Sequence, residues 1–160
     1  MACYLTLIVL LAGCEVGSAP VATSATPTSI DPALLQPLTA LGECTDAPAS
    51  TAQDDDVPGL VLPVGAVLTN VTRTDPVISV EGWVPLTPIQ LRVFYAEDTD
   101  LEIVQTEDEI WEAEILAING DRRVFVKAQA ICQDASLFVA VVAPEDAASA
   151  VPVPAGTPGS

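Results

Sequence analysis

The sequence contains no histidine, and this absence excludes several kinds of site at once. Ser–His and Cys–His nucleophile pairs both need an imidazole as the base. Zinc sites also depend largely on His and Cys ligands, so zinc is poorly supplied. We therefore expect a non-catalytic protein, with a small envelope hydrolase that uses paired carboxylates as the remaining enzymatic alternative.

Basic residues are scarce as well. The 160 residues include 5 Lys and Arg against 22 Asp and Glu, which gives a formal net charge of −17. A chain this acidic repels phosphate backbones, so we expect no nucleic-acid partner. Aromatic residues make up only 4% of the chain. Once its ends are set aside, the chain has room for one domain of about 90–100 residues.

Near the N-terminus the chain has one apolar run, from Tyr4 to Leu11. It is shorter than the roughly 20 residues that span a bilayer, and it has the length of a signal-peptide core. The residues Leu11-Ala12-Gly13-Cys14 resemble the lipobox of bacterial lipoproteins. The resemblance implies a signal peptide over residues 1–13 and a diacylated Cys14 that attaches the protein to membrane lipid, outside the cytoplasm, in the cell envelope or at the cell surface. A buried or truncated N-terminal segment is the alternative.

Low-complexity segments flank the centre of the chain. Residues 14–56 are rich in Ala, Pro, Ser and Thr, which is typical of a flexible tether. Within them, Asp31 to Leu41 could form a short helical turn interrupted by Pro37. Residues 144–160 repeat this composition, and we expect a disordered tail there.

The four cysteines divide into two groups. Cys3 lies in the expected signal peptide and Cys14 is the expected lipid site. Cys44 and Cys132 remain, and in an exported chain we expect them to form a disulfide. Two free thiols are the alternative.

The central residues 57–143 alternate between apolar and polar side chains, as strands do. Asp75-Pro76 and Asn119-Gly120-Asp121 are turn signals between such runs. Seven short runs at this spacing predict an all-β fold, a seven-stranded antiparallel sandwich. The expected strands are Ala66–Thr72, Val77–Val84, Ile89–Tyr95, Leu101–Thr106, Glu109–Leu116, Arg123–Ile131 and Leu137–Val142.

The third of these runs is ambiguous. Thr87 could cap a helix, Pro88 would suit its first position, and Gln90 would complete a capping box. The run itself is dominated by β-branched and aromatic residues in clean alternation, which favours a strand. We favour the strand; the alternative is an α+β fold with one helix at 87–97 over an antiparallel sheet.

Three features follow one another in order along the domain. A strand ends in glycine at Gly82, a tryptophan follows an acidic turn at Trp111, and Val124–Ala128 alternates as valine, x, valine, x, alanine. Over about residues 60–143 this order is similar to that of bacterial immunoglobulin-like modules. The resemblance implies an immunoglobulin-like sandwich that serves as an adhesive, spacer or accessory domain, without naming a ligand.

The densest polar feature is an acidic stretch near the middle of the chain. Asp98, Asp100 and Glu102 are candidate calcium ligands, because hard cations bind clustered carboxylate oxygens. With Glu109 they match four positions of an EF-hand loop, but Ile103 stands where that loop needs glycine. The stretch is therefore either a looser calcium site or a set of solvated acidic loops.

Two aromatic residues are candidates for a ligand platform. Trp83 and Phe94, if both point outward, could bind a sugar or a peptide, whereas Trp111 is expected in the core. Together these observations predict a membrane-anchored extracytoplasmic lipoprotein with a non-catalytic binding or structural domain, whose partner is an envelope protein or glycan. A calcium- or carbohydrate-binding accessory module is the alternative.

Overall fold

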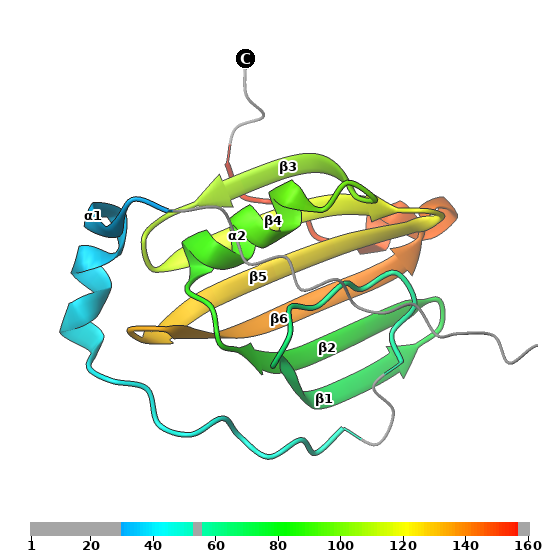
Figure 1. The fold of residues 1–160 in the computed structure, drawn as a ribbon. Coiled ribbons are helices and arrows are strands. Elements are labelled where there is room, and N and C mark those ends of the chain that lie inside the picture. Colours follow the sequence, from blue (N-terminus) through cyan, green and yellow to red (C-terminus); the bar gives the residue numbers. More distant parts are fainter. Residues whose placement is uncertain (1–29, 53–55, 157–160) are drawn as a thin grey trace, which may run out of the picture.

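A computed structural model describes residues 30–52 and 56–156, which form one antiparallel sheet with a helix on one face (Figure 1). The six strands lie in the spatial order β1-β2-β6-β5-β4-β3. Helix α2 (Pro88–Glu97) connects β2 to β3. The mostly β, antiparallel character that the sequence indicates is confirmed. The strands are β1 (Val67–Thr74), β2 (Val77–Val84), β3 (Glu102–Asp108), β4 (Glu112–Asn119), β5 (Arg122–Cys132) and β6 (Ala135–Pro144).

Strand β6 joins the two halves of the sheet. β1 and β2 form a hairpin, and β3, β4, β5 and β6 follow one another as a meander. Helix α2 carries the chain from β2 to the far edge of the sheet, so the meander ends beside β2 (Figure 1). There β6 pairs antiparallel with β2, with Ala140 opposite Val80.

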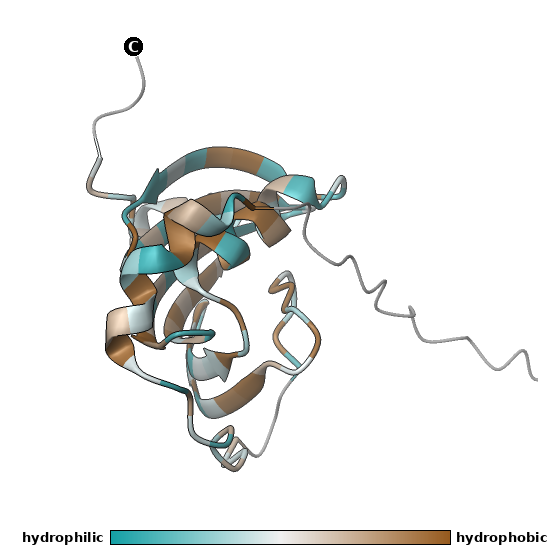
Figure 2. Cartoon of the chain, turned by 60° about the vertical axis from the view of Figure 1, so that its left-hand side comes forward, coloured by the Kyte–Doolittle hydropathy of each residue, from teal (hydrophilic) through white to brown (hydrophobic). Residues whose placement is uncertain are grey.

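The two faces of the sheet are covered differently. We call the face under the helix the α2 face and the opposite one the outer face. Side chains alternate between the faces, as they must along a strand, and Figure 2 shows the resulting changes in hydropathy along the ribbons. The main core lies on the α2 face, where Val80, Ile115 and Val126 pack with Leu91 and Tyr95 of the helix.

The strand that we expected at Ile89–Tyr95 is wrong, because these residues lie in α2. The capping box forms in full: Gln90 N donates to Thr87 Oγ1 at 3.3 Å, and Thr87 N donates to Gln90 Oε1 at 2.8 Å. The buried residues Pro88, Leu91 and Tyr95 follow helical spacing and face the sheet. End capping and this apolar stripe outweigh the strand preference of individual residues.

The seven-stranded, two-sheet sandwich is therefore not confirmed. Among the described residues the second layer consists of α2 and the irregular segment 57–66. Tyr95 Oη donates to the carbonyl oxygen of Val61 at 2.6 Å, which joins the two parts of this layer. The arrangement matches the α+β alternative, one helix over an antiparallel sheet.

Segment 57–66 covers the part of the α2 face that the helix leaves open. Val57 is buried, and Leu60 and Leu62 pack against the core. Gly59 has a φ of 86°, and a Cβ atom there would lie 2.7 Å from Cβ of Arg122. The segment therefore approaches the sheet at a point where only glycine fits.

The expected tether is partly structured. Residues 32–41 form a short α-helix, α1 (Pro32–Leu35), and a 3-10 helix, η1 (Gln36–Leu41), so the helical turn expected there is confirmed. Leu38 of η1 is only 1% exposed. Further along, the hydroxyls of Ser50 and Thr51 donate to carbonyl oxygens of β1. We call residues 30–52 the arm, because they lie against the domain instead of apart from it.

The tail after Pro144, for which we expected no fixed structure, also lies against the sheet. It forms a 3-10 helix, η2 (Glu145–Ala150), and Val151 beyond it is 4% exposed. Val151 packs on the outer face with Leu116 and Phe125. Part of the outer face is thus covered by the end of the chain.

Gly82 of β2 is a sensitive position of the sheet. It lies opposite Phe138, and an added Cβ would lie 2.4 Å from Cε1 of Phe138 and 2.6 Å from the carbonyl oxygen of Val67. We expect Gly82→Ala to lower the free energy of unfolding by about 1–3 kcal/mol through overpacking. Urea unfolding measures this. Ser79→Ala, at an exposed position of the same strand, is the control; equal stability of the two variants would contradict the prediction.

Candidate functional site

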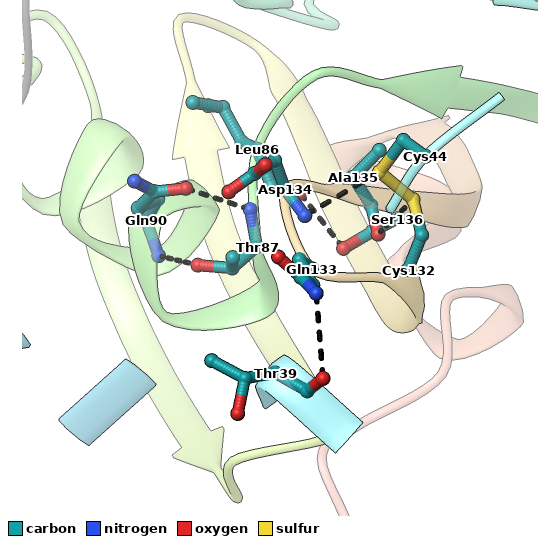
Figure 3. Close-up of a disulfide and its surroundings, with 10 residues drawn as sticks. All are labelled: Thr39, Cys44, Leu86, Thr87, Gln90, Cys132, Gln133, Asp134, Ala135 and Ser136. Carbon is teal, nitrogen blue, oxygen red and sulfur yellow. Dashed lines mark hydrogen bonds between the residues drawn. A yellow bond between two sulfur atoms is a disulfide. The ribbon is translucent and has the colours of Figure 1, made fainter. Parts of the chain in front are cut away.

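The predicted disulfide between Cys44 and Cys132 is confirmed (Figure 3). The two Cα atoms lie 5.0 Å apart, and the cysteines are separated by 88 positions in the sequence. The neighbouring residue Gln133 adds two contacts to the arm: its backbone N donates to the carbonyl oxygen of Gly42 at 3.0 Å, and its side chain donates to that of Thr39 at 3.3 Å. The bridge therefore fastens the arm to the turn between β5 and β6.

We expect the double variant Cys44→Ser/Cys132→Ser to lose about 4–5 kcal/mol of unfolding free energy, because the bridge closes a long loop in the unfolded chain. Denaturant unfolding of the oxidised protein measures the loss. Cys3→Ser is the control and should leave the bridge intact. Free thiols at both Cys44 and Cys132 in non-reducing mass spectrometry of the exported protein would refute the pairing.

The candidate calcium residues do not converge on one point. Asp98 ends α2 and its Oδ1 accepts the backbone N–H of Asp100 at 2.9 Å. The side chains of Asp100 and Glu102 are exposed to solvent. Among the residues that the structure describes, no group of three or more carboxylate or thiol side chains is arranged to hold a metal ion.

The two aromatic residues of the expected platform lie on opposite faces of the sheet. Gly82 and Val84 are buried on the α2 face, so the residue between them, Trp83, points to the outer face. Phe94 belongs to α2 and packs edge-on against Tyr95, with ring centroids 5.4 Å apart. They cannot form one platform. Trp111, expected in the core, is 40% exposed.

The outer face instead carries an apolar patch of its own. Trp83 of β2 lies opposite Leu137 of β6, which is 49% exposed. Val139, two residues further along β6, is 44% exposed. We call Trp83, Leu137 and Val139 the outer patch. Exposed apolar side chains gathered in one place are typical of surfaces that bind another molecule.

Beside the outer patch, one lysine joins two carboxylates. Lys127 Nζ lies 2.6 Å from Glu112 Oε1 and 2.9 Å from Glu114 Oε1. Hydrogen bonds to Glu112 and then Glu114 raise the pKa of Lys127, more than desolvation lowers it. The second oxygen of Glu114 accepts the backbone N–H of Ala155 in the tail at 2.9 Å.

Opposing effects act on the Glu114 carboxyl. Burial raises its pKa, but hydrogen bonds from Lys127 and Ala155, together with the charge of Lys127, outweigh burial and lower the pKa below its usual value. The carboxylate therefore stays ionised and holds the tail. Lys127 thus offsets part of the charge of the two carboxylates, and Glu114 also binds the backbone of the tail, which is a structural use of these ionised groups.

Comparison of the chain with protein-family profiles, with curated protein sequences and with solved structures gives no match. The helices in the described part of the chain are all too short or too polar to cross a membrane. Cys14 and the expected signal peptide over 1–13 lie outside the described residues.

The lowered pKa of Glu114 predicts an acid-sensitive contribution to stability. This contribution is fully present above the ordinary pKa of a glutamate, near 4.3, and is lost as the pH falls through the lowered value. At pH 7 we expect Glu114→Gln to cost about 1–2 kcal/mol, because charge-assisted hydrogen bonds are weakened. Urea unfolding between pH 7 and pH 2.5 should show the difference from the wild type shrink in acid.

The control is Glu102→Gln, which changes an exposed carboxylate on β3 and should alter stability little at either pH. A Glu114→Gln variant as stable as the wild type at pH 7 would show that the carboxylate does not hold the tail.

Proposed function

We propose that the chain is an extracytoplasmic lipoprotein, attached to the membrane through Cys14, that displays a non-catalytic binding domain. The observation that carries the proposal is the Cys44–Cys132 bridge. Structural disulfides persist in oxidising compartments and are rare in the cytosol, so the bridge supports export. Residues 1–13 would then be the signal peptide that export requires, and Cys14 at the end of the lipobox would be the site of attachment.

The position of the arm supports attachment at the N-terminal side. The arm begins at Ile30 and is fastened to the domain through Cys44. Between Cys14 and Ile30 the chain can span at most about 55 Å when fully extended. An acyl chain on Cys14 would therefore keep the domain within this distance of the membrane surface.

The binding role rests on the outer patch. The exposed side chains of Leu137 and Val139, with the half-buried Trp83 beside them, offer an apolar surface on strands that are otherwise well packed. The net charge of −17 disfavours anionic partners and leaves a neutral or cationic envelope protein, or a glycan, as the partner class.

The experiment is metabolic labelling with a palmitate analogue in a bacterial host that processes lipoproteins, followed by membrane fractionation. Cys14→Ser should lose the label and move to the soluble fraction, because no thiol remains to be acylated at that site. Cys3→Ser is the matched control and should keep both the label and the membrane association. Labelling or membrane retention of Cys14→Ser at the wild-type level would overturn the proposal.

A further inference from the structure

The tail occupies a defined surface on the outer face. Val151 packs against Leu116, Phe125 and Ala143, and all four side chains are nearly inaccessible to solvent. Val77 and Val141 border this cluster. We call this apolar cluster, with the polar groups of Gln105 and Glu114, the tail-docking surface.

The tail beyond Val151 is held through its backbone. Gln105 Nε2 donates to the carbonyl oxygen of Pro154 at 3.3 Å and to that of Gly156 at 3.0 Å. Glu114 Oε2 accepts the N–H of Ala155 at 2.9 Å. Side chains of the sheet therefore form hydrogen bonds with the backbone of an extended segment. Many peptide-binding domains likewise bind the backbone of their ligand.

The resident segment shows which chemistry this surface accepts. Residues 151–156 read Val-Pro-Val-Pro-Ala-Gly. Val151 and Pro154 are buried, whereas Pro152 and Val153 between them are exposed, so the side chains that contact the sheet are three positions apart. Proline has no backbone N–H, and a segment of this composition is extended before it binds, which lowers the entropy cost of binding.

The tail leaves part of the apolar surface uncovered. Along β6 the outward side chains are Leu137, Val139, Val141 and Ala143, and the tail covers only the end with Val141 and Ala143. Leu137 and Val139 continue the same row into the outer patch. A longer segment could therefore contact both surfaces, whereas the tail contacts one.

One polar atom under the tail also lacks a partner. Glu107 Oε2 is buried, and among the described residues no group donates a hydrogen bond to it. It lies beside Gly156, where an added Cβ would be 2.9 Å away. The tail thus fills the position next to this oxygen without satisfying it, whereas a segment with a donor there would bind better.

We propose that the outer face binds an extended, proline-containing apolar segment of another polypeptide, and that the chain's own tail occupies part of this binding surface in its absence. The tail is then a competitor held at a high effective concentration, because it is covalently attached beside the surface. A ligand from another chain must displace it, and its contacts with the outer patch supply the advantage. This inference names the partner class for the binding role proposed above, but it does not depend on the lipid anchor.

The test uses a fluorescent peptide with the sequence of residues 145–160 and measures its binding by anisotropy to the full chain. Val151→Asp should release the tail, because a charge replaces a buried side chain, and the variant should bind the peptide at least tenfold more tightly than the wild type. The same peptide carrying Val151→Asp should not bind either protein. Val153→Asp, at an exposed position of the tail, is the matched control variant and should behave like the wild type.

Two results would overturn the proposal: no binding of the peptide to a folded Val151→Asp protein, or equal binding to Val151→Asp and to the wild type. If Val151→Asp does not fold, a chain that ends at Ala150 is the second variant. It should bind the peptide at least tenfold more tightly than the wild type, because no attached segment then competes for the surface, and equal binding to the two proteins would overturn the proposal. Neither measurement involves Cys14, so failure here and failure of the lipid anchor are distinguished.

Discussion

The pairing of β2 with β6 is the interaction on which the rest of the structure depends. It joins a hairpin from early in the domain to the last strand of the meander, and it brings Gly82 under the ring of Phe138. A six-stranded sheet has two large faces, and ten residues of helix cannot cover even one of them. Segment 57–66 therefore completes the α2 face, and the tail covers part of the outer face. Irregular chain does the covering that a second sheet does in a sandwich.

The sequence predicted the strands well because apolar and polar side chains alternate along most of them, although β4 and β6 carry apolar side chains on both faces. The run at 77–84 is predicted to the residue, and the turns at Asp75-Pro76 and Asn119-Gly120-Asp121 lie between strands as expected. The helix was missed although its signal was present. In a run of only seven residues, β-branched and aromatic side chains can alternate by chance. A capping box with proline at the first helical position is stronger evidence, because each residue satisfies a specific need of a helix N-terminus. The capping hydrogen bonds between Thr87 and Gln90 thus outweigh the alternation of the run.

The candidate site was less predictable, for a physical reason. The pair of Glu114 and Lys127 follows from the sequence once the tight turn after Asn119 fixes the register of β4 and β5. The docking of Val151 cannot be predicted from the sequence, because a segment of Val, Pro, Ala and Gly has the composition of a disordered chain. Only the structure of the sheet shows where this segment packs. A platform of Trp83 and Phe94 required both side chains to point outward from strands. Trp83 lies on the outer face, but Phe94 belongs to α2, so the platform does not form once the third run is a helix.

Three of the five basic residues hold irregular parts of the chain against the sheet. Exposed ion pairs contribute little free energy, so their value lies in where they hold the chain. Arg73 donates to the carbonyl oxygen of Asp56, next to the segment that covers the α2 face. Arg123 binds Glu145 at the start of the tail, and Lys127 supports the carboxylate that holds the tail's end. In a chain with a net charge of −17, the loss of any one of these cations leaves excess negative charge beside an irregular segment. Because Arg123 and Lys127 both hold the tail, the tail is the segment that the loss of a cation would release first.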